Sequence, residues 1–352
     1  GQRALKGKAA VSLSVVNPKP ASGDPLGQRG TLQLHAGGTG VEHLGWIVPN
    51  HALRRTAFEI AATEPGVQII TQARVLNVRT LPTHAEVEFQ DASAPDLPPQ
   101  RLCAPLVVAA DSRFSNTRRQ LGMGAAITDF GRTVIVCRMR HELPHDDTAH
   151  ECFGYERTLA ILPLPSDWLD GQPQCSAVVT ADAEQASALL ELPAEEFTAQ
   201  VAAQFGHRLG AMTLVGERHA YPLVAVYAHR FSGPRCALLG DAAVGMHPVT
   251  AHGYNLGLAG VHSLTHLLQT AYARGQDLGT ASVLQPYASA HHRHAWPLFQ
   301  GTNAIVRLFT DTRPLPRLLR QAVLAGSRRL PPLQAAIVSQ LTGRRPAWPR
   351  LG

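Results

Sequence analysis

The residues best placed to do chemistry lie in one short stretch of the chain. An apolar run, Cys236 to Leu239, ends in Gly240-Asp241, and the segment Gly253 to Gly257 then opens a helical pattern. The run is typical of a buried strand, so Asp241 is expected at the strand's carboxyl end. A carboxylate there can accept hydrogen bonds from sugar-like hydroxyl groups. The glycines let the backbone approach a flat ligand, and the helix start offers free N–H groups and a positive dipole end to an anion.

These features together predict a flavin site. The carboxylate would accept hydrogen bonds from the flavin's polyol chain, and the helix start would stabilise negative charge on the electron-rich ring. The alternative, from spacing alone, is an ordinary strand-to-helix turn with an incidental aspartate. A second apolar run, Pro105 to Ala110, ends in Asp111. It indicates another buried parallel strand that delivers a side chain to the carboxyl edge of the sheet.

The elements around these strands follow from periodicity and from glycine and proline. Residues 1–44 show little periodicity and are expected to be irregular, and a helix is predicted from His51 until Pro65-Gly66 stops it. Short strands with a Pro-rich loop at 94–99 should then form a small meander; they are Val67–Ile70, Arg74–Val78 and Ala85–Phe89.

Residues 130–230 predict an inserted domain built on an antiparallel sheet, with β-type runs around one helix, Pro193–Phe205. From Asn255 a helical pattern continues to the end, with breaks expected at Gly275, Pro286, Pro297 and Pro314. The expected boundaries are 1–124 and 231–290 for two segments of one nucleotide-binding domain, 125–230 for the inserted domain and 291–352 for a C-terminal helical segment.

Three stretches resemble, in order and spacing, the FAD-dependent aromatic hydroxylases of the ubiquinone-biosynthesis branch. They are Leu239-Gly240-Asp241-Ala242-Ala243 with His247-Pro248 and Gly253 to Leu258, then Ala110 to Arg118, and Trp46 to His51 with Arg54-Arg55. Leu159 to Leu164 is similar to the family's substrate-domain strand. The resemblance covers roughly residues 44–330.

The resemblance implies an α/β fold: a Rossmann-like FAD-binding domain, an inserted antiparallel-sheet substrate domain and a helical tail. It also implies that FAD is reduced by NAD(P)H and reacts with O2 to hydroxylate an electron-rich ring. The implied catalytic residue is Pro248, beside the flavin's oxygen-reacting edge, and His252 is a second catalytic candidate from its own chemistry. The implied cofactor-binding residues are Asp241, Gly240, Gly253, Asn255, Leu256, Asp111, Asn50, Arg54 and Val75.

The sequence departs from the family's pattern at three places. Ser112 replaces a glycine and would be strained if that position has positive φ. Ala251-His252 stands where relatives commonly have Gly-Gln; His252 could tune proton transfer or be a hydrogen-bonded bystander. No strand–G-x-G-x-x-G–helix unit is found, because Gly38-Thr39-Gly40 has His43 in place of the third glycine. We therefore expect an N-terminally truncated FAD-binding domain.

Composition narrows the classes of protein and partner. The net charge is +6, but ten arginines and one acid lie from His291 onward. Because these arginines alternate with aliphatic residues rather than aromatics, a peripheral membrane surface at the inner face of the membrane is favoured over nucleic acid, with a solvated helix face as the alternative. Five scattered cysteines indicate a reducing, cytoplasmic compartment. His262 and His266 are four residues apart, but packing or surface placement is favoured over a metal site.

The leading hypothesis is a flavin monooxygenase that hydroxylates a polyprenylated phenol or quinol, with demethoxyubiquinol as one candidate substrate. The expected partners are that substrate, O2, and a membrane surface or a biosynthetic complex. A second hypothesis is a catalytically incomplete remnant that acts as an accessory subunit. A third is a flavin-dependent reductase or halogenase of the same fold. G-x-S-x-G and P-loop sequences do not occur, so the common hydrolase and NTPase classes are excluded.

Overall fold

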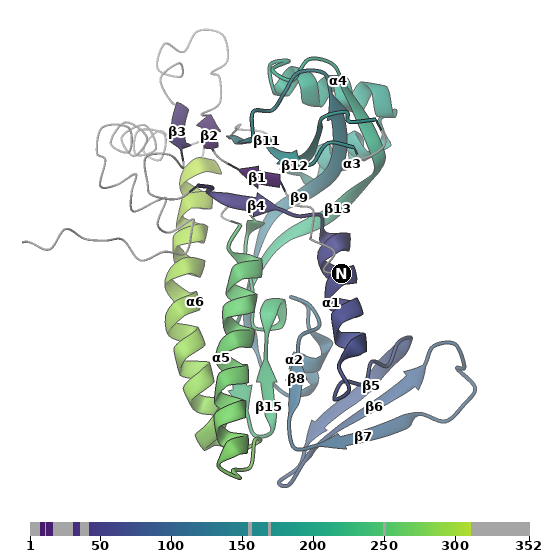
Figure 1. Ribbon diagram of the computed structural model, residues 1–352, viewed down its shortest axis with the longest axis vertical. Coiled ribbons are helices and arrows are strands. Elements are labelled where there is room, and N and C mark those ends of the chain that lie inside the picture. The colour runs from purple at the N-terminus through teal and green to yellow at the C-terminus, as the bar shows by residue number, and fades with distance from the viewer. Residues whose placement is uncertain are drawn as a thin grey trace, which may run out of the picture. The chain divides into compact units, whose positions relative to one another are not determined.

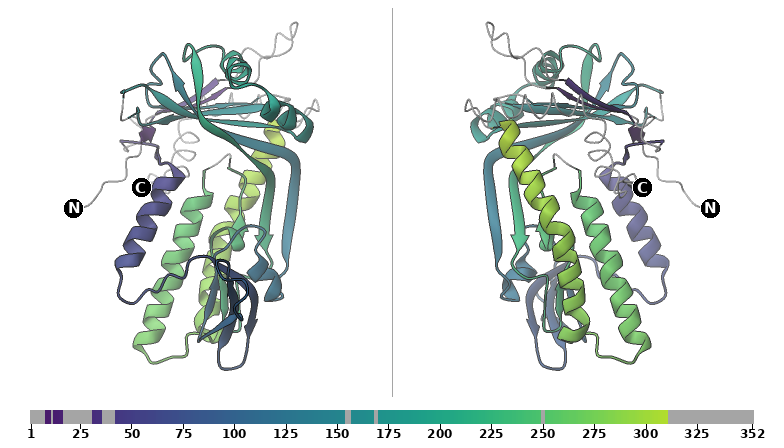
Figure 2. Two further views of the ribbon diagram at one scale, coloured as in Figure 1. Left: turned by 90° about the vertical axis from the view of Figure 1, so that its right-hand side faces the viewer. Right: turned by 90° about the vertical axis from the view of Figure 1, so that its left-hand side faces the viewer.

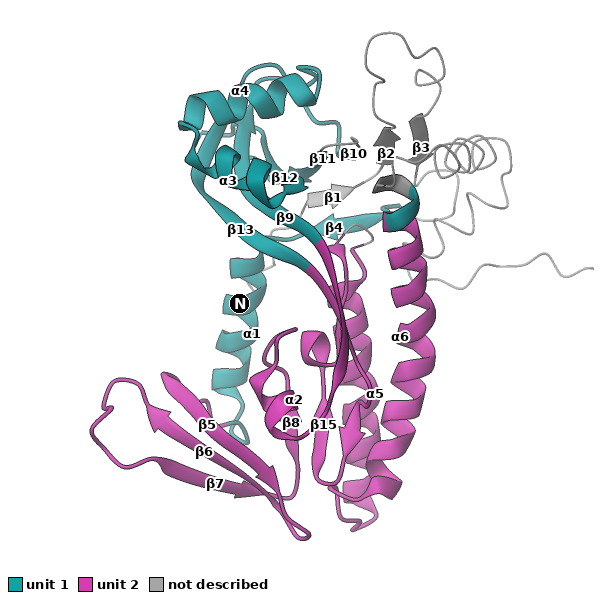
Figure 3. Ribbon diagram, turned by 180° about the vertical axis from the view of Figure 1, so that it is seen from behind, with its two compact units in different colours: residues 1–67, 131–223, 307–352 teal, residues 68–130, 224–306 magenta. Residues whose placement is uncertain are grey.

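The computed structural model describes residues 8–10, 12–16, 31–35, 42–153, 157–167, 170–248 and 251–310. The chain divides into two compact units (Figure 3). Unit 1 comprises residues 1–67, 131–223 and 307–352, and unit 2 comprises residues 68–130 and 224–306. Each unit has its own hydrophobic core. The predicted fold class, a mixed α/β chain with an antiparallel inserted sheet, is confirmed.

Unit 1 is built on antiparallel strands. Neighbouring strands are β9 (Ala125–His141), β12 (Gln174–Asp182), β11 (Thr158–Leu164) and β10 (Thr148–Cys152), in that order. The helices α3 (Ala183–Glu191) and α4 (Ala194–Gln204) pack their buried side chains against this sheet (Figure 1). Only α4 was predicted. The start of α3 is fixed by Asp182, whose side chain accepts a hydrogen bond of 2.8 Å from the Gln185 N–H.

The expectation that residues 1–44 are irregular is wrong. Three short strands lie there: β1 (Lys8–Ala10), β2 (Ser12–Val16) and β3 (Thr31–His35). β2 pairs with β10 in parallel and with β3 in antiparallel orientation, and β1 pairs with β4 (Gly45–Ile47). The alternation of polar and apolar residues in Ser12 to Val16 is a strand signal that the abundance of glycine and proline obscured.

The first predicted helix is confirmed as α1 (Asn50–Thr63), which ends just before Pro65-Gly66. None of its residues is buried. The strand expected at Val67–Ile70 is wrong, because that segment has no regular structure. A four-residue apolar run becomes a strand only where a neighbouring strand pairs with it.

Unit 2 contains two small sheets. One has the order β14 (Ser232–Gly233), β15 (Cys236–Leu238), β8 (Val107–Ala109). The other is a meander of β5 (Ala73–Thr80), β6 (Ala85–Asp91) and β7 (Gln100–Ala104), of which β5 and β6 were predicted and β7 was not. The strand β13 (Met212–Ala228) ends in this unit and pairs there with β16 (Val244–Gly245). The connections carry α2 (Asn116–Gln120) and a 3₁₀ turn, η2 (Gly240–Ala242).

Two long helices run side by side in unit 2: α5 (Gly253–Ala273) and α6 (Ala281–Thr310) (Figures 1 and 2). The break at Gly275 is confirmed, whereas the breaks expected at Pro286 and Pro297 are wrong, because α6 continues through both residues. An interior proline costs about 3 kcal/mol. Buried α6 side chains on both sides of the prolines offset this cost, among them Tyr287 and Phe299. No helix in the described part of the chain is both long and apolar enough to span a membrane.

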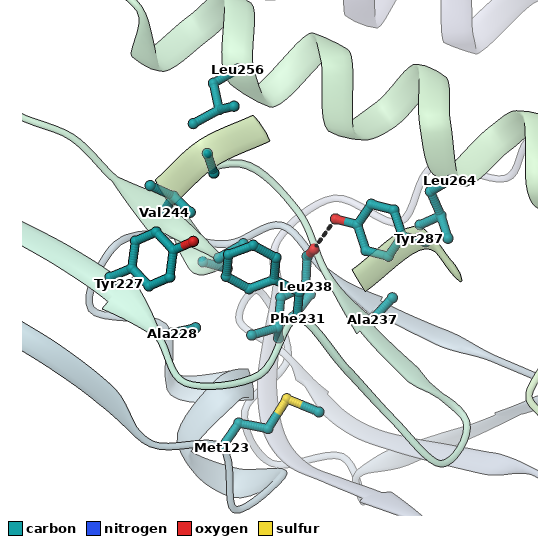
Figure 4. Packing of buried hydrophobic residues seen from close by; sticks show 14 of the residues in the cluster. Met123, Tyr227, Ala228, Phe231, Ala237, Leu238, Val244, Leu256, Leu264 and Tyr287 are labelled. Atoms are coloured by element: carbon teal, nitrogen blue, oxygen red, sulfur yellow. Dashed lines mark hydrogen bonds between the residues drawn. The ribbon is translucent and has the colours of Figure 1, made fainter. Parts of the chain in front are cut away.

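The core of unit 2 fixes β15 against α6. The Tyr287 hydroxyl donates a 2.6 Å hydrogen bond to the main-chain oxygen of Leu238 (Figure 4). Both residues are fully buried, and Phe231 and Leu256 belong to the same cluster. The end of β15, from which Asp241 follows, is therefore held rigidly.

Candidate functional site

The two aspartate-bearing motifs meet because their strands are neighbours. β8 and β15 pair in parallel, with Val107 opposite Cys236 and Ala109 opposite Leu238, and the ladder continues with a 2.8 Å bond from the Leu239 N–H to the Ala109 oxygen. Asp111 and Asp241 follow the carboxyl ends of these strands. The predicted parallel strands are confirmed, but only β15 is fully buried, because Val108 of β8 is 37% exposed. The pairing brings together two motifs 130 positions apart in the sequence.

Asp241 is oriented by Arg113. The Arg113 Nη2 and Nε donate to Asp241 Oδ2 at 3.0 and 3.2 Å, and its Nη1 donates to the Val224 oxygen at 2.9 Å. A Cβ at Gly245 would lie 2.8 Å from the Arg113 Cβ, so only glycine fits beside this arginine. Asp241 Oδ1 accepts neither of these bonds, and 41% of the side chain is exposed. The carboxylate therefore keeps one oxygen for a ligand hydroxyl.

Asp111 is engaged within its own loop. Its carboxylate accepts bonds from the Ser115 hydroxyl at 2.5 Å and the Thr117 N–H at 3.3 Å. Partial burial alone would raise the pKa of Asp111, but these hydrogen bonds lower it below its ordinary value. Arg118, 3% exposed, links this loop to the other motif by donating to the Ala242 oxygen at 2.8 Å and the Arg113 oxygen at 3.2 Å.

The start of α5 lies directly against η2. A Cβ on Gly257 would sit 3.6 Å from the Gly240 Cα, so the first turns of the helix pack on the backbone beside Asp241. No side chain caps α5, and a Cβ at Gly253 would have open space around it. The N–H groups of the first turn lack partners within a helix and carry its positive dipole end. The site thus places a carboxylate oxygen beside a helix end suited to negative charge.

The other predicted residues of this segment take different positions. Asn255 is exposed on the first turn of α5, and His252 is the N-cap residue. Leu256 is 3% exposed in the core, and its N–H donates to the His252 oxygen at 2.8 Å, so its side chain holds the helix in place. Pro248 is exposed, and its oxygen accepts a 2.9 Å bond from the Ala251 N–H.

Three predicted cofactor-binding residues lie on other elements of the fold. Asn50 and Arg54 are exposed on α1, which belongs to unit 1. Val75 lies on β5 of unit 2 and is 47% exposed. Their contact with a cofactor stays a prediction.

The backbone accounts for two of the departures noted in the sequence. Ser112 is not among the described residues with positive φ, so the strain considered for it does not arise. Ala251, where relatives commonly have glycine, has φ of +52°. This left-handed conformation costs a residue with a Cβ about 1–2 kcal/mol.

Sequence reasoning missed two residues of the site, Arg113 and His247. Burial, and then the nearby charge of Arg113, lower the pKa of His247 to about 4, so its imidazole is neutral at pH 7. The His247 ring packs edge to face against the Phe130 ring, with the two ring centroids 5.1 Å apart. Both residues stand in the motifs quoted above. The available signal for Arg113 was that it follows one strand closely, as the Asp241 carboxylate follows the neighbouring strand.

This donor set suits the flavin half of FAD. The free oxygen of Asp241 can accept from ribitol hydroxyls, the open space at Gly253 admits a flat ring, and the uncapped α5 start can stabilise negative charge on that ring. When bound, FAD supplies the two-electron chemistry with O2 that side chains alone cannot perform.

Comparison with known sequences agrees with the site. The FAD binding domain family matches residues 35–302. The chain is 43% identical to the ubiquinone hydroxylase UbiM of Neisseria meningitidis, over 97% of this chain and 68% of that protein. It is 32% identical to the ubiquinone hydroxylase UbiL of Rhodospirillum rubrum, over 85% of this chain and 67% of that protein. It is 24% identical to the 3-demethoxyubiquinol 3-hydroxylase of Escherichia coli, over 81% of this chain and 70% of that protein.

Solved structures share the fold. The p-nitrophenol 4-monooxygenase PnpA of Pseudomonas putida superposes with a TM-score of 0.72 over 97% of this chain and 83% of that chain, at 15% identity. The flavin-dependent brominase Bmp2 superposes with a TM-score of 0.70 over 96% of this chain and 77% of that chain, at 12% sequence identity. The parallel strands ending in Asp111 and Asp241, the uncapped α5 and the matched sequences agree: the chain belongs to the FAD-binding-domain family of flavin-dependent monooxygenases, enzymes that use FAD as cofactor and NAD(P)H as reductant.

Proposed function

We propose that this enzyme hydroxylates the aromatic ring of a polyprenyl phenol or quinol in ubiquinone biosynthesis. The observation that carries the proposal is the 43% identity, over 97% of the chain, to a protein named as a ubiquinone hydroxylase. Demethoxyubiquinol is the candidate substrate we place first, because the similarity extends to a 3-demethoxyubiquinol 3-hydroxylase.

The proposed reaction balances with NAD(P)H and O2. One oxygen atom replaces a ring hydrogen as a hydroxyl group, and the other leaves as water. NAD(P)H gives two electrons and one proton, and a solvent proton completes the water. An electron-rich phenol or quinol ring suits this chemistry, because its ring carbon attacks an electrophilic oxygen.

The residues of unit 2 bind and orient in this proposal. Asp241 holds the polyol chain of the cofactor through Oδ1, while Arg113 holds Oδ2 and so fixes the carboxylate plane. The α5 start stabilises negative charge on the cofactor ring. Pro248, at the turn before α5, is the proposed neighbour of the reacting edge, and His252 is the proposed proton carrier there.

The test is product identification with the FAD-loaded protein. It is supplied with NAD(P)H, O2 and short-chain analogues of successive quinol precursors, and the products are separated by chromatography and identified by mass and ring position. We expect hydroxylation of one ring position in one class of analogue. NAD(P)H oxidation without any hydroxylated product would favour a reductase, and halogenated product in the presence of bromide would favour a halogenase. Failure to take up FAD would favour an accessory protein.

We also propose that the enzyme works at a membrane surface, where polyprenylated substrates partition. The support is the arginine-rich sequence from His291 onward, of which Arg293 and Arg307 lie on α6. Sedimentation with vesicles of anionic lipid should carry the protein down at low salt and release it at high salt. Equal sedimentation with neutral vesicles would contradict the electrostatic part of this proposal.

A further inference from the structure

A separate cluster of metal-ligand side chains lies on the meander of unit 2, formed by β5, β6 and β7 (Figure 1). One ligand atom each from His84, Glu86 and Cys103 lies within 4.8 Å of the other two. We propose that these three residues form a binding site for a divalent transition metal, with Zn²⁺ as the ion that fits best. The proposal is independent of the flavin site and of the proposed substrate.

The sheet register places the three ligands on one face. His84 directly precedes β6, and its Nε2 lies 3.1 Å from Glu86 Oε1, so the two side chains lie on the same side. Glu86 pairs directly with Cys103 on the neighbouring strand. The other face of the meander is apolar, with Val78 2% exposed and Phe89 4% exposed. The ligands therefore belong to the polar face.

The carboxylate is already divided between two partners. Glu86 Oε2 accepts a 2.6 Å bond from Arg79 Nε, and Glu86 Oε1 lies 3.1 Å from His84 Nε2. Arg79 thus fixes the carboxylate with Oε1 directed to the cluster, as outer partners of metal ligands do.

His84 has a partner that selects the ligating nitrogen. The Thr83 Oγ1 lies 3.0 Å from His84 Nδ1. When Nδ1 carries the proton and donates a hydrogen bond to the Thr83 hydroxyl, Nε2 has a free lone pair. That lone pair is directed toward Glu86 Oε1. A bound cation there replaces the hydrogen bond between Nε2 and Oε1. The tautomer of a ligating histidine is commonly set in this way.

The ligand chemistry selects the ion. A thiolate, an imidazole and a carboxylate disfavour Mg²⁺ and Ca²⁺, which take oxygen ligands, and suit Zn²⁺, which takes sulfur, nitrogen and oxygen together. Cys103 is exposed, so its sulfur is accessible to an incoming ion. The thiolate and the carboxylate supply two negative charges to Zn²⁺, and Arg79 stays paired with the carboxylate. Three protein ligands leave a fourth position for water.

A polar depression adjoins the cluster on the same face of the meander. It has a volume of about 60 Å³ and is lined by Glu86, Glu88, Asn77, Arg79 and Arg101. It shares only Glu86 with the cluster, so an ion held by the three residues takes its fourth ligand from solvent, to which Cys103 is exposed.

The experiment is metal titration of the reduced, tag-free protein with Zn²⁺ against a chromophoric chelator, and with Co²⁺ followed by absorption spectroscopy. We expect one equivalent to bind and Co²⁺ to give a thiolate charge-transfer band in the near ultraviolet. Cys103→Ser should abolish the charge-transfer band and lower the Zn²⁺ affinity at least tenfold. Thr83→Val should lower the Zn²⁺ affinity several-fold but keep the band.

One control variant makes the result decisive. The pair variant His262→Gln with His266→Gln removes two exposed imidazoles from α5 and should leave the affinity unchanged. Circular dichroism should show that each variant is folded. Unchanged Zn²⁺ affinity in Cys103→Ser, or loss of binding in the α5 pair variant instead, would overturn the proposal.

Discussion

Replacing Asp241 with alanine should separate cofactor binding from folding. Its partner Arg113 keeps its bond to the Val224 oxygen, and the side chains of the Arg113–Asp241 pair are 30% and 41% exposed. Partly exposed pairs contribute about 0.2–1 kcal/mol. We therefore expect Asp241→Ala to lower the free energy of unfolding by less than about 1 kcal/mol.

The expected loss of FAD affinity is larger. Each hydrogen bond between a carboxylate and a ligand hydroxyl contributes about 1.5–3 kcal/mol. At about 1.4 kcal/mol for each factor of ten, one lost bond weakens FAD binding by about 10- to 150-fold. Asp241→Asn should give an intermediate loss, because the amide oxygen still accepts a hydrogen bond but carries no charge.

The assay is FAD titration followed by flavin fluorescence, with urea unfolding of the same samples. Asp182→Ala is the matched control, because Asp182 caps α3 in unit 1. Losing that cap should cost about 0.5–2 kcal/mol of stability and leave FAD affinity unchanged. Equal FAD affinity in wild type and Asp241→Ala, or an equal loss in Asp182→Ala, would refute the assignment of Asp241.

Other consequences follow from the core and the backbone around the site. Tyr287→Phe leaves the buried oxygen of Leu238 without its 2.6 Å donor and should cost about 1–3 kcal/mol in urea unfolding; a neutral effect would contradict the bond. Ala251→Gly relieves the strain at φ of +52° but makes the unfolded chain more flexible, so stability should change by no more than about 1 kcal/mol, with a gain expected; a clear loss would contradict the left-handed backbone. The pKa of His247 is lowered to about 4, below its unfolded value of about 6.5. Between these pH values only the unfolded state binds the proton, so stability should fall as pH drops from about 6.5 to 4, and His247→Gln should reduce that slope in unfolding titrations at stepped pH.

The elements that sequence reasoning predicted well have strong local signals. The run before Asp241 and the run before Asp111 are continuously apolar and end in an acid, and both form strands, of which the first is fully buried. The alternation in Ala85 to Phe89 matches β6. In such segments burial on one or both faces leaves little freedom in the residue pattern.

The elements it missed depend on distant contacts. α6 passes through Pro286 and Pro297 because its buried face packs into the core, which no local rule reveals. Val67–Ile70 has a strand-like composition but no strand there.

The site shows the same limit. The aspartate positions followed from strand ends, but the Arg113–Asp241 pair requires knowing that β8 and β15 are neighbours. Likewise, the metal-ligand cluster of His84, Glu86 and Cys103 depends on the register of two antiparallel strands, and the cysteine lies 17 positions after the glutamate. Register is fixed by the buried face of the meander rather than by the ligands themselves.

The most direct test of the central claim is isotopic. The FAD-loaded enzyme is given NAD(P)H and a quinol substrate under oxygen-18 gas in ordinary water, and the product is analysed by mass spectrometry. A monooxygenase built on the Asp111 and Asp241 strands predicts one oxygen-18 atom in each hydroxylated product, and sharply less product with Asp241→Ala at limiting FAD. A new hydroxyl group that carries only oxygen from water, or full turnover by Asp241→Ala at limiting FAD, would contradict the account.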